Sequence, residues 1–260
     1  MKALVTICDV SYSVLLPYWL GKIRKLTNLP VFVLALGNIN IDSDQSLDCN
    51  IIQVDPTGNP FPTNLPDHAC AEKLRLFRHL PSSASEILFL DIDLMVLHDF
   101  WNDAPYFEIS EQKFVATQDL FVGYKEKMED EFRPFDAPFR MKFFPDGGWY
   151  YFNTGVFFAS RDAHAEMFDG FLAVWKQYVE MLGKYPSIFD QNVINYCLIR
   201  FGVEAEPLPV QNNCLRQYPK ILENGEFFLY GLRVNALHFN GGTIELKLAR
   251  WLEAEKEMEG

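Results

Sequence analysis

The sequence predicts an α/β protein in which a mostly parallel central sheet is flanked by helices. Short apolar runs rich in strand-forming residues occur at residues 3–7, 31–36 and 86–90, as expected for strands buried on both faces. A segment with helical spacing of apolar side chains, residues 11–26, separates the first two runs. Strand, helix and strand at this spacing are typical of parallel α/β layering. The 260 residues are enough for one large hydrophobic core.

The other elements follow from the same two patterns, helical spacing for helices and short apolar runs for strands. Pro, Asn and Gly crowd residues 55–66, which we therefore expect to form a loop. In chain order we expect a strand at 3–7, a helix at 11–26, strands at 31–36 and 50–54, a helix at 69–80, strands at 86–90 and 150–159, and helices at 163–182, 191–201 and 246–258.

Composition excludes several classes of function. Lys and Arg number 23 and Asp and Glu 35, a net charge of −12, whereas binding nucleic acid or an anionic membrane requires positive charge. The five cysteines form no C-x-x-C pair, which gives no support to a zinc or redox site and fits free thiols in a reducing cytosol. Asp9 interrupts the first apolar run too early for a signal peptide, and no transmembrane stretch is present. We therefore expect a single cytoplasmic domain, residues 1–260.

The strongest chemical signal is the motif D-I-D at residues 91–93, which directly follows an apolar strand. A buried strand cannot keep bare carboxylates in its interior, so Asp91 and Asp93 mark the carboxyl end of that strand. In extended chain, residues two apart point to the same side. Two carboxylates at that spacing repel each other, and a divalent cation relieves the repulsion and can bridge to a diphosphate. The alternative is an exposed turn with two solvated acids.

Three weaker signals follow along the chain. N-T-G at 153–155 interrupts a strongly apolar strand, where the glycine permits close approach of a ligand or another backbone and Asn153 offers a donor and an acceptor. The alternative there is a β-bulge with a satisfied Asn. Asp190 opens a helix, as an N-cap or as a site residue. His238 ends an apolar run before a glycine turn, as a ligand or as a structural hydrogen-bonding residue.

Taken together, six motifs in this order resemble the GT-A glycosyltransferases that use nucleotide sugars, in particular the retaining family 8 (glycogenin and galactosyltransferase-like). The matching segments are T-I-C-D-V-S-Y at 6–12, E-K-L-R-L at 72–76 followed by L-P at 80–81, D-I-D at 91–93, F-N-T-G-V at 152–156, D-Q at 190–191 and H-x-x-G at 238–241. The resemblance spans essentially the whole chain and implies a single GT-A domain.

The resemblance also implies which residues act. The metal ligands would be Asp91, Asp93 and His238, holding Mn²⁺ or Mg²⁺, and an imidazole ligand favours Mn²⁺. The candidates for stabilising the charge that develops on the sugar are Asp190, Gln191 and Asn153. The residues expected to contact the nucleotide sugar are Thr6, Cys8, Asp9, Tyr12, Lys73, Asp91, Ile92, Asp93, Gly241 and Lys247.

The implied reaction is transfer of a sugar from a nucleoside diphosphate sugar, in particular a UDP-sugar, to an acceptor hydroxyl with retention at the anomeric carbon. A glycan, a lipid-linked compound and a protein all remain open as the acceptor, because the sequence does not reveal its identity. The sequence departs from the family at two points. Ile244 stands where the family has the lysine of H-x-x-G-x-x-K, the nearest lysine being Lys247, and Lys73 stands where the family has Arg.

Two other functions remain open. A haloacid-dehalogenase-type phosphatase also uses an apolar strand ending in D-x-D, but that family has Thr four residues after the first Asp, where this chain has Met95. An inactive sugar-nucleotide-binding protein is the second alternative.

The segment 119–148 shows no sustained period and contains Pro134, Pro138 and Pro145. Long irregular segments of this kind are functional loops or disordered, and the many aromatic residues favour an ordered segment. We expect a lid that closes over the donor cleft, with Asp119 and Asp136 near acceptor hydroxyls. The alternative is a static excursion that covers the sheet edge.

Overall fold

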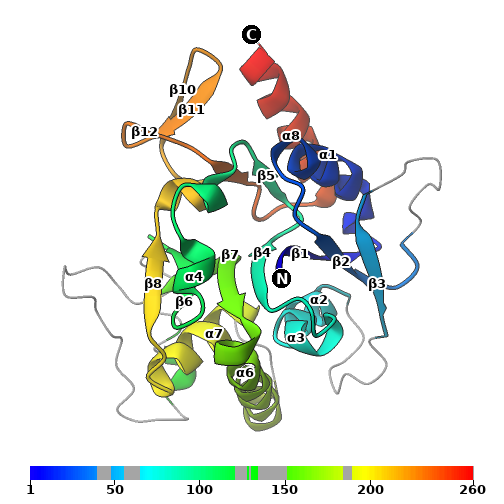
Figure 1. The fold of residues 1–260 in the computed structure, drawn as a ribbon, viewed down its shortest axis with the longest axis vertical. Coiled ribbons are helices and arrows are strands. Elements are labelled where there is room, and N and C mark those ends of the chain that lie inside the picture. Colours follow the sequence, from blue (N-terminus) through cyan, green and yellow to red (C-terminus); the bar gives the residue numbers. More distant parts are fainter. Residues whose placement is uncertain are drawn as a thin grey trace.

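The computed structural model describes residues 1–39, 48–55, 65–120, 128, 130–133, 151–183 and 189–259. A seven-stranded sheet with the order β3-β2-β1-β4-β7-β6-β8 forms the centre of the molecule (Figure 1). Its strands are β1 (Lys2–Asp9), β2 (Val31–Leu36), β3 (Asn50–Val54), β4 (Glu86–Leu90), β6 (Phe114–Gln118), β7 (Phe152–Ser160) and β8 (Ala205–Leu208).

All strands of this sheet run parallel except β7, which is antiparallel to both of its neighbours, β4 and β6. The prediction of an α/β fold with a mostly parallel sheet is therefore confirmed. The reversal of β7 matters for the site. It places the amino end of β7 at the same edge as the carboxyl ends of β1 and β4, where ligands bind in such sheets.

Helices cover both faces of the sheet. The helices are α1 (Leu16–Leu26), α2 (Leu65–Lys73), α3 (Leu76–His79), α4 (Tyr106–Ile109), α6 (Arg161–Leu182), α7 (Phe189–Arg200) and α8 (Ile244–Glu259). Buried side chains of α2, α3, α6 and α7 join one hydrophobic cluster, and those of α1, α4 and α8 join a second on the opposite face. Strand β1 serves both clusters by alternation: Val5 and Ile7 belong to the first, and Leu4 and Cys8 to the second.

Two small sheets complete the described fold. One consists of β5 (Leu94–Val96), β13 (Ala236–His238) and β9 (Cys214–Leu215). The other is a hairpin-like sheet of β10 (Lys220–Glu223), β11 (Glu226–Leu229) and β12 (Leu232–Arg233), which projects from the molecule next to the C-terminal helix (Figure 1). Short 3₁₀ turns lie at Tyr12–Leu15, Phe100–Asn102 and Val210–Asn213. The first small sheet is important because it brings the late residue His238 beside the chain that leaves β4.

Most predicted elements agree with the structure, with local corrections. The helix expected at 69–80 is wrong as a single element, because a turn at residues 74–75 separates α2 from α3. The loop expected at 55–66 ends earlier, since α2 begins at Leu65. Most of segment 119–148, including Asp136, lies outside the described residues, so the lid stays a prediction. In the described part of the chain, every helix is too short or too polar to cross a bilayer.

Candidate active site

A cavity of about 510 Å³ opens at the carboxyl edge of the parallel strands. Strand β1 ends there at Asp9, β4 is followed there by Asp91, and the antiparallel β7 begins there. Its walls also include segments from α2, α7, α8 and the loop after β13. Of the predicted site residues, the structure brings to this cavity Asp9, Tyr12, Lys73, Asp91, Ile92, Asp93, Asn153, Asp190, Gln191, His238, Gly241 and Lys247.

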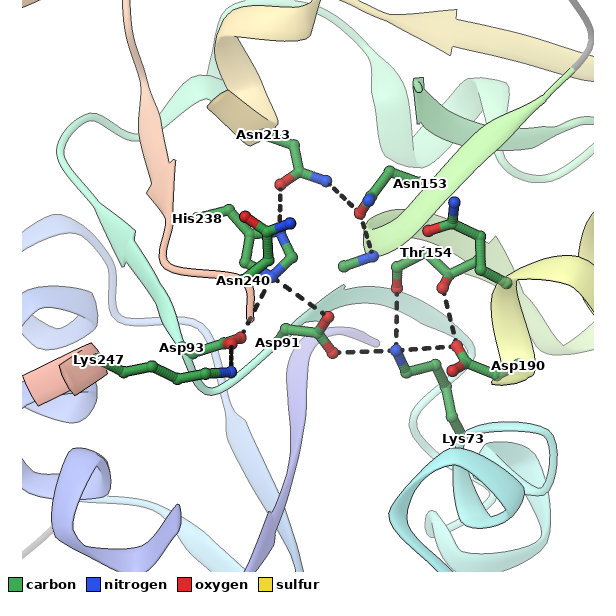
Figure 2. Close-up of polar contacts among 12 residues, drawn as sticks. Lys73, Asp91, Asp93, Asn153, Thr154, Asp190, Asn213, His238, Asn240 and Lys247 are labelled. Atoms are coloured by element: carbon green, nitrogen blue, oxygen red, sulfur yellow. Dashed lines mark hydrogen bonds and ion pairs between the residues drawn. The ribbon is translucent and has the colours of Figure 1, made fainter. Parts of the chain in front are cut away.

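Asp91, Asp93 and His238 form a cluster in which one ligand atom from each lies within 4.8 Å of the others. His238 Nε2 is 3.3 Å from Asp93 Oδ1 and 3.8 Å from Asp91 Oδ2 (Figure 2). The two carboxylates approach through a turn, in which Leu94 N donates to Asp91 O at 3.2 Å, rather than through extended chain as predicted. Asp93 is only 6% exposed, so the alternative of two solvated acids is wrong for this residue.

The lack of a side chain at Gly155 leaves room for this cluster. A Cβ at that position would lie 2.7 Å from His238 Cε1 and 2.9 Å from Asp91 Oδ2, closer than real Cβ atoms approach other groups. The sequence predicted a close approach here, and the approaching groups are the imidazole and the carboxylate. A glycine at 155 is therefore required by the geometry of two of the three ligand candidates, His238 and Asp91.

Lys73 connects two carboxylates on the α2 side of the cavity. Its Nζ is 3.0 Å from Asp91 Oδ1 and 3.1 Å from Asp190 Oδ2, and it donates to Thr154 O at 3.3 Å. Burial would lower the pKa of Lys73, but Asp190 and Asp91 outweigh it and raise that pKa. Asp190 lies inside α7 rather than before it, and its Oδ2 also accepts from Thr154 Oγ1 at 2.8 Å. The N-cap alternative for Asp190 is therefore wrong.

Lys247 occupies the opposite side, where it pairs with Asp93 and donates to Tyr12 Oη at 2.8 Å. Burial would raise the pKa of Asp93, but His238 and Lys247 outweigh it and hold that pKa well below its usual range. The pKa of Asp91 is instead raised, first by burial and then by repulsion from Asp93, against the opposing influence of Lys73. The two carboxylates of one motif are therefore electrostatically different.

Asn153 is satisfied within the protein, as its alternative interpretation predicted. Its Oδ1 accepts from Gly155 N at 2.8 Å and from Asn213 Nδ2 at 2.7 Å, and its Nδ2 donates to Asp119 at 3.4 Å. The pairing of β6 with β7 shifts register beside it, between Ala116 and Thr117. Asn153 nevertheless lines the cavity.

Two predicted residues do not reach the cavity. The side chains of Thr6 and Cys8 share the face of β1 that packs toward α1 and α8, and both are fully buried there. Burial raises the pKa of the Cys8 thiol to about 12. The side chain that follows them on the other face, Asp9, does line the cavity, and its Oδ1 accepts from Tyr12 N at 2.9 Å.

Sequence reasoning missed Asn213. Its Oδ1 lies 2.8 Å from His238 Nδ1, and the residue is 1% exposed. The only signal was the run Q-N-N at 211–213, three amides directly before an apolar pair. Polar residues next to an apolar run are common in loops, so this run does not predict a site by itself.

No protein-family model and no curated protein matches the sequence. Solved structures do match. Galactosyltransferase LgtC, in complex with donor and acceptor sugar analogues, has a TM-score of 0.60 and 18% identity over 98% of this chain and 95% of its own. Mouse xyloside xylosyltransferase 1 has a TM-score of 0.64 and 14% identity, covering 94% of this chain and 99% of that one.

The bifunctional glycosyltransferase WbbM has a TM-score of 0.57 and 16% identity, and it matches 99% of this chain with 51% of its own length. At these identities the likeness concerns the fold. The sequence-based prediction of fold is confirmed by it, since the matched proteins share the sheet and helix arrangement over nearly the whole chain. The protein therefore has the fold of the GT-A glycosyltransferases.

Proposed function

We propose that this protein is a metal-dependent glycosyltransferase that moves a sugar from a nucleoside diphosphate sugar to an acceptor hydroxyl. The observation that carries the proposal is the cluster of Asp91, Asp93 and His238 at one wall of a 510 Å³ cavity, in a fold found in glycosyltransferases. A UDP-sugar donor and retention at the anomeric carbon follow from the family that the sequence resembles. LgtC was solved with donor and acceptor sugar analogues, which supports a sugar donor for this cavity.

The residues present fit a divalent metal. Two carboxylates and an imidazole converge within 4.8 Å, and Gly155 keeps a side chain out of the space beside them. A mixed oxygen and nitrogen ligand set favours Mn²⁺ over Mg²⁺, which prefers oxygen alone. When bound, the metal would act as a Lewis acid on the departing diphosphate.

The two lysines supply fixed positive charge for the diphosphate. Lys73 and Lys247 both line the cavity and both contact the carboxylate cluster. Lys247 lies three residues after Ile244 on α8, about one helical turn, so it can reach the same region from the next turn. Positive groups held in place before the reaction stabilise the charge that develops on a leaving group.

On the sugar side, Asp190 and Gln191 face the cavity from the start of α7. Breaking a glycosidic bond builds positive charge at the anomeric carbon, which a carboxylate or an amide oxygen stabilises. The amide nitrogen of Gln191 donates to Asp119 at 3.1 Å and to Tyr151 at 3.0 Å, so its oxygen is the atom left for the sugar. Asp190 is engaged by Lys73 and Thr154, which makes Gln191 the stronger candidate.

A binding panel tests the proposal and its alternatives. UDP-, GDP-, CMP- and dTDP-sugars, each with and without Mn²⁺, should include one donor that raises the melting temperature only with the metal. A ligand at 100 times its dissociation constant adds about 2.7 kcal/mol, which is about 5–10 °C for a domain of this size. Release of nucleoside diphosphate separates an enzyme from an inactive binder. Phosphate release from simple monoesters, with no response to any nucleotide sugar, would instead favour the phosphatase.

A further inference from the structure

Asn153 lies between two residues of the proposed reaction, His238 and Gln191, and is bonded indirectly to both. Its orientation is fixed by the backbone, because Gly155 N–H can only donate and does so to Asn153 Oδ1 at 2.8 Å. The amide oxygen must therefore face Gly155, and the amide nitrogen must face the other way, toward Asp119.

The first connection runs to the imidazole. Asn153 Oδ1 also receives a hydrogen bond from Asn213 Nδ2 at 2.7 Å, which forces Asn213 to present its oxygen to His238 Nδ1 at 2.8 Å (Figure 2). An amide oxygen only accepts, so Nδ1 must carry a proton. Nε2 is then directed at the two carboxylates, 3.3 and 3.8 Å away, where a metal would bind.

The second connection runs to Gln191. Asn153 Nδ2 donates to Asp119 Oδ2 at 3.4 Å, and the same oxygen accepts from Gln191 Nε2 at 3.1 Å. Gln191 Nε2 also donates to Tyr151 Oη at 3.0 Å, whose own proton goes to Asn192 Oδ1 at 2.7 Å. Both bonds require the amide nitrogen of Gln191 to face the protein, which leaves the amide oxygen for the cavity that this residue lines.

We propose that Asn153 is a positioning residue that determines which atoms donate and which accept hydrogen bonds, both on the metal side of the site at His238 and on the sugar side at Gln191. Through Asn213 it keeps Nε2 of His238 available as a metal ligand, and through Asp119 it helps to direct the amide oxygen of Gln191 into the cavity. This role replaces the direct part in catalysis that the sequence suggested for Asn153. It deepens the proposed function and rests on it for the identity of the metal and of the sugar.

Mn²⁺ titrations without nucleotide test the first connection. Asn213→Leu removes the acceptor for Nδ1–H. Asn153→Leu removes the group that orients Asn213, although Asn153 is not itself the hydrogen-bond partner of the imidazole. Loss of a partner that orients a histidine ligand typically weakens metal affinity about 10–100-fold, and we expect this loss in both variants. Tyr151→Phe is the matched control, since it removes the hydrogen bond that Tyr151 accepts from Gln191 and leaves the first connection intact. We expect it to leave Mn²⁺ affinity within about twofold of the wild type while it lowers kcat more than it changes KM.

Nitrogen NMR of the metal-free protein provides a readout independent of turnover. His238, assigned by comparison with His238→Gln, should carry a proton on Nδ1 in the wild type and in Tyr151→Phe, and should lose it in both leucine variants. An unprotonated Nδ1 in the wild type would overturn the inference even if neither leucine variant folds. Unchanged Mn²⁺ affinity in folded Asn213→Leu would overturn it as well. If the Mn²⁺ affinities and the Nδ1 protonation are as expected but no nucleotide sugar is consumed, the proposed function fails and the positioning of His238 stands.

Discussion

The two carboxylates of the D-I-D motif are neutralised by different groups at the two ends of the cluster, which we call the Asp93 end and the Asp91 end. At one end Asp93 faces His238 and Lys247, and together they hold its pKa well below the usual range. At the other end Asp91 shares Lys73 with Asp190, and its pKa is raised by burial and by repulsion from Asp93. One motif thus contains a carboxylate whose charge the fold stabilises and one whose charge the fold tolerates poorly.

This difference shows that the two ends of the cluster depend on different elements of the fold. The Asp91 end is built from α2 and the start of α7, which belong to the first hydrophobic cluster, and from the end of β4, whose side chains alternate between the two clusters. The Asp93 end depends on β13 and α8, elements near the end of the sequence that belong to the second cluster. Variants at the two ends should therefore differ in how strongly they change metal affinity and how strongly they change the free energy of unfolding.

The largest effect is expected from Asp93→Asn on metal binding. Removing one carboxylate charge a few ångströms from a divalent ion should weaken Mn²⁺ affinity on the order of 10²-fold or more, since a single pair of unit charges at 4 Å is worth about 4 kcal/mol at an effective dielectric of 20. Isothermal titration with Mn²⁺ measures the loss, and circular dichroism shows that the variant is folded. Unchanged Mn²⁺-dependent donor binding in this variant would remove Asp93 from the metal site.

The next largest effect is expected on the free energy of unfolding when Lys73 or Lys247 is replaced, and the two variants should differ. Lys73→Met leaves Asp91 and Asp190 without their shared cation, and breaking a buried ion pair costs about 3–5 kcal/mol. Lys247→Met leaves Asp93 beside His238, so the loss should be smaller. Urea unfolding of the metal-free variants at neutral pH compares them. Equal losses, or a larger one for Lys247→Met, would contradict the asymmetry.

A smaller effect is expected from a buried histidine outside the site, His164, on the pH dependence of stability. His164, away from the cavity, is 2% exposed, and burial lowers its pKa from 6.5 to about 4. The unfolded chain therefore takes up this proton first as the pH falls. His164 therefore does not lower the free energy of unfolding above about pH 6.5, and it should lower it by about 3 kcal/mol by pH 4. His164→Asn, whose amide oxygen can still accept from Ser160 N, should lose this part of the pH dependence, which urea unfolding across pH 4–7 would show.

The sequence was sufficient for features that depend on local pattern. The apolar run at 86–90 predicts β4, and the carboxylates after it mark the open edge of the sheet, because burial in a strand excludes them. Gly155 was expected to permit a close approach, and it does. These predictions succeed because each depends on one segment and on the cost of burying charge.

The remaining features depend on which segments meet, and local pattern does not contain that. Nothing in F-N-T-G-V shows that β7 runs antiparallel, and nothing in Q-N-N shows that Asn213 contacts His238. The faces of β1 illustrate the same limit. Alternation predicts that Thr6 and Cys8 lie opposite Asp9, but only the packing of α1 and α8 decides which face is closed. Amide orientation also depends on donors from distant strands, as at Asn153.

The contact between Tyr12 and Lys247 joins residues separated by 235 positions. A chain that emerges from the ribosome from its amino end presents β1, α1 and β2 before α8 has been synthesised. It cannot close the Asp93 end of the cavity until α8 is available. Contacts of such high sequence separation are intrinsically slow to form. Metal binding at the proposed site is therefore expected only after α8 has been synthesised and has docked, which would make it a reporter of that docking.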